Sequence, residues 1–140
     1  MTLATNYPDT LAEVTAVFHR HEEALLRHDP QTLDAMFLPA HHTVRYGVAE
    51  MQYGIEEVRQ FRASQSPFQR SLSRTVITTF GQHMAIASTL FHRPDCPGQI
   101  GRQMQTWIRT DAGWKIAAAH VSMISNGGSH VLQTRRPRPL

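Results

Sequence analysis

Arg45 is the residue whose setting best suits the binding of an acidic molecule. It lies two residues before Gly47, and alternation along a strand puts Val44 and Tyr46 on the opposite face. A guanidinium group binds a carboxylate through two parallel, charge-assisted hydrogen bonds. An exposed arginine on an edge strand, or an ion pair with Glu50, explains the same pattern. Arg45 is therefore a candidate substrate-binding residue, with these structural alternatives open.

His21 is a candidate for acid–base chemistry. It lies on the apolar stripe of an expected helix, between Phe18 and Leu25. A histidine on such a stripe must find a hydrogen-bond partner or line a wet cavity. Its ordinary pKa near ~6.5 suits proton transfer at neutral pH. A core histidine whose hydrogen bonds are satisfied is the structural alternative.

Two polar residues, His120 and Ser122, end the last expected strand. Simple alternation places them on the same face as Trp114 and Ile116, which are apolar. A face that changes from apolar to polar is typical of a pocket mouth, and equally of a sheet end that meets solvent. His120 and Ser122 are therefore candidate pocket residues, His120 as a second possible acid.

Gln103 and Gln105 share one face of an expected strand with Trp107. That combination is typical of a polar pocket wall or of a subunit interface. No spacing points to a bound metal or organic cofactor, because the motifs G-x-G-x-x-G, H-E-x-x-H and the P-loop are absent. We therefore expect chemistry without a metal or a cofactor.

The elements that must position these residues begin with helices and end with strands. Apolar residues spaced three and four apart predict helices over 9–28 and 55–65, with a short helix from Pro30 between them. Segments 42–46 and 50–53 predict a hairpin. Four further strands are predicted over 72–80, 84–93, 100–109 and 114–124. This order favours an α+β fold, in which an antiparallel meander curls around the helices and leaves a pocket between the two layers.

Composition limits the class of protein and its partners. The chain has 140 residues, of which 41% are hydrophobic, and this fits one domain over 9–125 with an arm over 1–8. The last segment, 126–140, reads as a basic disordered tail. It holds three of the 14 basic residues, and without these three the basic and acidic residues are equal in number. A neutral body argues against nucleic acid as a partner.

Two further features of the sequence indicate a cytoplasmic location. No apolar run reaches the ~18–20 residues of a membrane helix, and no secretory signal is recognisable at the N-terminus. The single cysteine, Cys96, fits a reducing compartment. We therefore expect no membrane partner.

Four blocks of the sequence, at 43–54, 74–81, 101–107 and 114–122, form a distinctive set. The most specific motifs in them are Arg-Tyr-Gly at 45–47 and Gln-Thr-Trp at 105–107. Together these blocks resemble the AtzH-like/HpxZ family of the SnoaL-like, NTF2-like (cystatin-like) superfamily. The resemblance implies a cone-shaped α+β barrel, a homodimer formed through its sheets, and a role in ureide and s-triazine nitrogen catabolism beside an amidase. It also implies action on 1,3-dicarboxyurea to give allophanate.

The resemblance also implies roles for particular residues. Arg45 matches the pocket arginine of the family, and the other matching pocket positions are Glu50, Gln103, Gln105 and His120. One departure matters, because His21 stands where AtzH-type sequences carry a tyrosine. On this reading Arg45 clamps a carboxylate and His21 or His120 is the general acid. A binding or accessory protein without turnover is the competing hypothesis.

Overall fold

Three helices and six strands make up the computed structural model, which describes residues 4–126. The predicted tail therefore lies outside the described residues, except for its first position. The helices are α1 (Pro8–Leu26), α2 (Pro30–Ala35) and α3 (Ile55–Ser64). The strands are β1 (Val44–Tyr46), β2 (Met51–Tyr53), β3 (Ser71–Phe80), β4 (Met84–His92), β5 (Gln99–Thr110) and β6 (Gly113–Ser125). The predicted order of elements is confirmed, with small differences in their ends.

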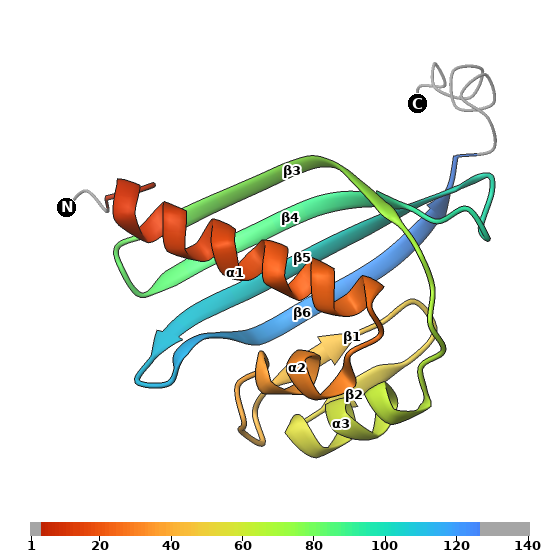
Figure 1. Cartoon of the computed structure of the whole chain (residues 1–140), viewed down its shortest axis with the longest axis horizontal. Helices are drawn as coiled ribbons and strands as arrows, with labels where there is room; N and C mark the ends of the chain where they lie inside the picture. Colours follow the sequence, from red (N-terminus) through yellow and green to blue (C-terminus); the bar gives the residue numbers. More distant parts are fainter. Residues whose placement is uncertain (1–3, 127–140) are drawn as a thin grey trace, which may run out of the picture.

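The strands form one curved sheet in the order β2-β1-β6-β5-β4-β3. The four long strands form the predicted antiparallel meander, and β1 and β2 form the predicted hairpin. The sequence did not predict the parallel pairing of β1 with β6, which joins the hairpin to the meander. Figure 1 shows α1 lying across the long strands, with α2 and α3 grouped beside the β1–β2 hairpin. This is the α+β architecture that the sequence predicts, with helices on one side of a curved antiparallel meander.

The core lies between α1 and the sheet. Val14 and Phe18 on α1 pack in one cluster with Trp107 and Ile116, and all four are almost completely buried. Burying a side chain of this size contributes ~1.5–3 kcal/mol. The apolar stripe that predicted α1 is therefore its sheet-facing side, and it carries His21 towards the sheet. No helix among residues 4–126 is long and apolar enough to cross a bilayer.

A β-bulge in β6 changes which residues face the helices. Thr106 pairs with Ala118, whereas the next residue, Trp107, pairs with Ile116, so Ala117 is an extra residue in β6. An inserted residue reverses the alternation of side chains beyond it. The expectation that His120 shares a face with Ile116 is therefore wrong.

Candidate functional site

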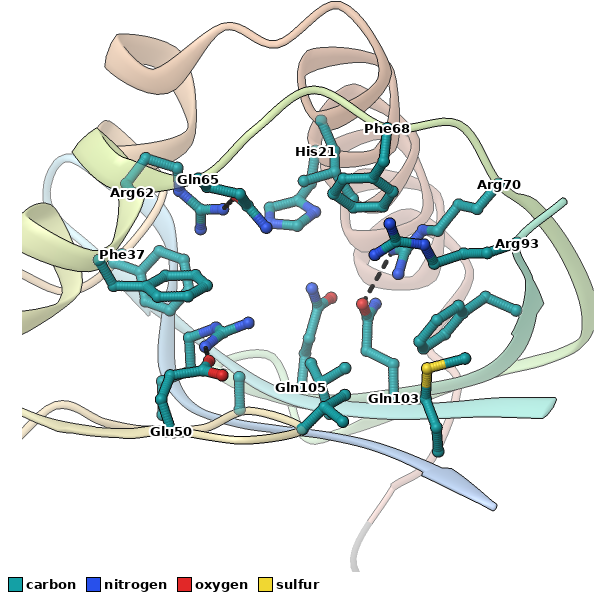
Figure 2. Close-up of a pocket in the computed structure, with 18 residues that line it drawn as sticks. His21, Phe37, Glu50, Arg62, Gln65, Phe68, Arg70, Arg93, Gln103 and Gln105 are labelled. Atoms are coloured by element: carbon teal, nitrogen blue, oxygen red, sulfur yellow. Dashed lines mark hydrogen bonds and ion pairs between the residues drawn. The ribbon is translucent and has the colours of Figure 1, made fainter. Parts of the chain in front are cut away.

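A pocket of about 170 Å³ lies between the helices and the concave side of the sheet. Side chains from α1, β1, α3, β4, β5 and β6 line it, together with residues in the loops between these elements. Figure 2 shows His21 opposite Gln103 and Gln105, with Arg62 and Glu50 at one end and Arg70 and Arg93 at the other. A volume of this size suits a small polar molecule.

Arg45 lies at one end of the pocket and is 8% exposed. Its Nη1 donates to Oε1 of Glu50 at 2.7 Å and to Oε1 of Gln52 at 2.9 Å. Its guanidinium group lies 4.4 Å from the ring centroid of Phe61. A Cβ at position 47 would overlap the Glu50 carboxylate, so a larger residue there would displace the side chain of Glu50 from its place beside Arg45. Arg45 therefore lines the pocket and also pairs with Glu50. The sequence left these two possibilities open as alternatives.

Burial and ion pairing together determine the pKa values of Arg45 and Glu50 at this end of the pocket. Burial lowers the pKa of Arg45, and the hydrogen bond to Glu50 opposes that effect. Burial acts to raise the pKa of Glu50, but hydrogen bonds from Arg45 and Ala49 outweigh it and hold the pKa below its usual value. Glu50 is therefore ionised at neutral pH and positions Arg45.

Arg62 on α3 is a second buried arginine at this end, and sequence reasoning missed it. Its Nη1 donates to Oε1 of Gln65 at 2.7 Å. Its closest carboxylate oxygen, Oδ1 of Asp34, lies 3.9 Å from Nε, and neither atom has a hydrogen-bond partner among residues 4–126. Burial first, and then the charge of Arg45, lower the pKa of Arg62 to about 10. Arg62 therefore remains charged at neutral pH and is only partly compensated.

Arg70 and Arg93 lie at the opposite end. Arg70 forms two hydrogen bonds with the buried carboxylate of Glu22, at 2.9 and 2.7 Å. Arg93 pairs in the same two-point manner with Asp95, which is exposed. Each guanidinium group also stacks on a phenylalanine ring, Arg70 on Phe91 at 4.6 Å and Arg93 on Phe68 at 4.2 Å. Sequence reasoning missed these four charged residues, because their partners are far apart along the chain or lie in loops.

Gln103 and Gln105 form part of the pocket wall. In the single chain, the first of the two sequence-based alternatives, a polar pocket wall, therefore describes them. Both are buried, at 5% and 3% exposure. Oε1 of Gln103 accepts from Arg70, and Oε1 of Gln105 accepts from Nε1 of Trp107. Arginine and the indole N–H can only donate, so the amide orientations are determined. The NH₂ groups are left as donors, and the wall therefore suits a ligand rich in acceptor oxygens.

His21 lies in the pocket with its side chain buried. Its ring is 6.3 Å from that of Trp107, and its Nε2 has no hydrogen-bond partner within 4–126. Burial first, and then the charges of Arg62, Arg70 and Arg45, lower the pKa of His21 from 6.5 to about 3. The imidazole is therefore neutral at pH 7, and its pKa lies well below the ordinary value that suits proton transfer at that pH.

The depressed pKa of His21 predicts a specific dependence of stability on pH. Between pH 6.5 and about 3 the unfolded chain binds more protons at this position than the folded chain. Stability therefore falls as the pH falls through this window, by up to about 1.4 kcal/mol per pH unit, and is unaffected by His21 above it. Urea unfolding of the wild type and His21→Phe at pH 7, 6 and 5 measures this. The free energy of unfolding of the wild type should fall steadily relative to that of His21→Phe as the pH is lowered. A difference that stays constant from pH 7 to pH 5 would contradict the assignment.

His120 and Ser122 lie outside the pocket. The bulge at Ala117 turns both towards the outer face of the sheet, where His120 is exposed and its ring lies 6.2 Å from that of Tyr46. Ser122 accepts a hydrogen bond from Nε of Arg102 at 3.1 Å. Neither side chain can reach a ligand in this pocket.

Within residues 4–126, no group of three or more histidine, cysteine, aspartate or glutamate side chains is arranged to hold a metal ion. The polar groups that line the pocket are guanidinium, amide, imidazole and carboxylate groups. Guanidinium and amide groups can bind an anion, and an imidazole can move a proton.

Comparison with family models and solved structures shows which proteins this chain resembles. The AtzH-like family model matches residues 3–127. A protein of unknown function from the DUF3225 family of Pectobacterium atrosepticum is 50% identical, with a TM-score of 0.84 over 86% of this chain and 95% of that chain. A cystatin-like fold protein of Burkholderia xenovorans is 45% identical, with a TM-score of 0.85 over 89% and 98%.

More distant structures share the fold alone. An NTF2-like protein of unknown function from Pseudomonas putida is 15% identical, with a TM-score of 0.70 over 81% of this chain and 86% of that chain. None of the functionally curated proteins compared with the chain matches it.

Proposed function

Because this chain belongs to the AtzH-like family, we propose that its pocket binds a small organic acid of the ureide type and removes an N-carboxylate from it. The compound we propose is an N-carboxylated urea such as 1,3-dicarboxyurea. The observation that carries the proposal is the lining of the pocket, in which buried arginines and oriented glutamines present hydrogen-bond donors. Such a lining complements a ligand with several carboxylate and carbonyl oxygens.

The binding step is assigned to Arg45. Its guanidinium group is buried, is held by Glu50 and Gln52, and stacks on Phe61. A group held from several sides loses little freedom when a carboxylate binds, so more of the interaction energy appears as affinity. We therefore assign Arg45 the role of carboxylate clamp, with Gln103 and Gln105 donating to the remaining carbonyl and carboxylate oxygens of the ligand.

The proton-transfer step is assigned to His21. Breaking the N–CO₂ bond leaves an electron pair on nitrogen, which must gain a proton as CO₂ departs. Burial is the largest cause of the low pKa of His21, and the charges of Arg62, Arg70 and Arg45 add to it. A bound anion would counterbalance these three charges, so anion binding raises that pKa. On this proposal His21 takes a proton from solvent when the anion binds and delivers it to the nitrogen. No metal or cofactor takes part.

A competing function is binding without turnover, as an accessory protein of an amidase. It is favoured by one observation, the presence of a neutral, buried imidazole in place of the tyrosine expected in AtzH-type sequences. An isomerase or cyclase acting on a larger apolar substrate is disfavoured, because Arg45, Arg62 and Arg70 would be left facing an apolar molecule.

The experiment that tests the proposal is CO₂ release from freshly made 1,3-dicarboxyurea at controlled pH. The wild type is expected to exceed the uncatalysed rate, and His21→Phe to lose about 100-fold or more, the contribution typical of a general acid. Full activity in His21→Phe would refute its assigned role. Ligand binding by the wild type without CO₂ release above background would favour the accessory protein.

We also propose a homodimer formed through the outer face of the sheet. Strand register aligns one row of side chains across five strands, namely Val76, Ser88, Met104, His120 and Tyr46. Val76, Met104 and Tyr46 are large hydrophobic residues that are 57%, 52% and 40% exposed. Contiguous exposed apolar side chains on one face are typical of an interface. In this arrangement His120 is an interface residue, and the pocket stays on the opposite side of the sheet.

A further inference from the structure

The two ends of the pocket use their arginines differently. At one end, Arg70 and Arg93 each direct the Nε–Nη2 edge of the guanidinium group at a carboxylate of the protein. Arg70 donates through these two atoms to Glu22 at 2.9 and 2.7 Å, and Arg93 donates to Asp95 at 2.9 and 2.6 Å. This edge is the one that binds a carboxylate at two points. At this end of the pocket, a carboxylate of the protein already occupies this edge on both arginines and compensates both charges.

At the other end the same edges carry no hydrogen bond from the described part of the chain. Arg45 contacts Glu50 and Gln52 through Nη1 alone. Arg62 contacts Gln65 through Nη1, and no carboxylate comes closer to it than 3.9 Å. Arg45 therefore keeps a two-point edge for a ligand, and the charge of Arg62 beside it lacks a hydrogen-bonded carboxylate.

We propose that the pocket is polarised, with a carboxylate end at Arg45 and Arg62 and a charge-neutral end at Arg70 and Arg93. The ligand class that fits is a monocarboxylate whose far end is an amide or urea carbonyl. At the neutral end the NH₂ group of Gln103 remains as a donor, held in place by Arg70, and it suits an uncharged carbonyl oxygen. Figure 2 shows Gln103 on the side of Arg70 and Arg93.

The proposal deepens the proposed function, and it rests on the pocket being a site for a small organic acid. For an N-carboxylated urea it assigns an orientation. The carboxylate that remains in the product is held by Arg45. The carboxylate that leaves lies at the neutral end beside Glu22 and Asp95, where the protein offsets its charge least. That placement favours its loss as uncharged CO₂.

Calorimetric titration with three matched probes tests the polarity in the wild type. Succinate, succinamate and succinamide have almost the same shape and carry two, one and no carboxylates. We expect succinamate to bind at least as tightly as succinate. We expect succinamide to bind at least about 30-fold more weakly, because it has no charged group for Arg45.

Two matched variants test the cause of the polarity. Glu22→Gln removes the charge that compensates Arg70 but keeps an oxygen acceptor, so the succinate-to-succinamate affinity ratio should rise by about tenfold. Glu50→Gln makes the same change at the carboxylate end, and it should strengthen the binding of both acids with little change in the ratio. Thermal unfolding confirms that each variant is folded.

The outcomes separate this proposal from the proposed function. If the wild type binds succinate more than about tenfold tighter than succinamate, the polarity is refuted while the acid-binding pocket stands. An unchanged ratio in folded Glu22→Gln also refutes it. If none of the three probes binds the wild type, both the polarity of the pocket and its acid-binding function are refuted.

Discussion

Replacing Arg45 with methionine will lower the affinity for succinate by at least about 30-fold. The substitution removes the two-point contact and leaves the Glu50 carboxylate, 2.7 Å from the lost group, facing the ligand. Truncating one partner of a buried, hydrogen-bonded charge pair costs ~2–5 kcal/mol in binding, and each 1.4 kcal/mol is roughly tenfold in affinity. Calorimetric titration measures the change. CO₂ release should fall with it, because the substrate is no longer held.

Two variants separate lost recognition from general damage. In Arg45→Met/Glu50→Gln the repulsion from Glu50 is gone, so part of the affinity should return. Arg109→Met is the matched control, since Arg109 pairs with Glu13 at 2.8 Å and is absent from the pocket lining. It should bind succinate as the wild type does. If the Arg45→Met protein is folded and binds succinate with unchanged affinity, Arg45 does not contact the ligand.

Replacing Arg70 with methionine will cause a large loss of stability, of ~3–5 kcal/mol. The reason is that Glu22, whose side chain is 11% exposed, would keep its charge in the interior without its partner. For a domain of this size, such a loss lowers the melting temperature by roughly 10 °C or more. Chemical unfolding in urea measures the difference directly.

The control for this prediction replaces both partners. Glu22→Leu/Arg70→Met removes the buried charges together, and it should regain most of the lost stability, because an apolar pair of similar volume packs without an unpaired charge. Arg93→Met is the exposed counterpart, since Asp95 is 58% exposed and stays hydrated. Its loss should be much smaller. Equal losses in Arg70→Met and Arg93→Met would show that burial does not set the strength of these pairs.

Most of the fold was predictable because its signals are local. The helix stripe of Val14, Phe18 and His21 repeats every three to four residues, and it faces the sheet as predicted. Turns between the long strands gave the antiparallel meander. The pairing of β1 with β6 was not predictable in this way, because it joins segments about 70 residues apart that share no turn.

The site was only partly predictable, for two physical reasons. Arg45, His21, Gln103 and Gln105 lie in regular elements, where periodicity indicates the direction of a side chain, and all four line the pocket. His120 and Ser122 do not, because one extra residue in β6 reverses the alternation and leaves no mark in the composition of the strand.

Other pocket residues depend on contacts that no local pattern encodes. Arg70 is oriented by Glu22, 48 positions earlier in the chain, and by Gln103, 33 positions later. Arg62 is on α3 but is 4% exposed, and an arginine on a short amphipathic helix is normally read as a solvated residue. The burial of such charged side chains can be recognised only from the packed tertiary structure.

The most direct test of an acid-binding pocket observes the arginine side chains themselves. The Nε–Hε signals of ¹⁵N-labelled protein can be assigned from the spectra of Arg45→Met, Arg62→Met and Arg109→Met. Saturating succinamate is expected to shift the signals of Arg45 and Arg62 and to leave that of Arg109, on the surface, unchanged. If the Arg45 signal stays in place at saturating succinamate, the pocket is not the carboxylate site described here.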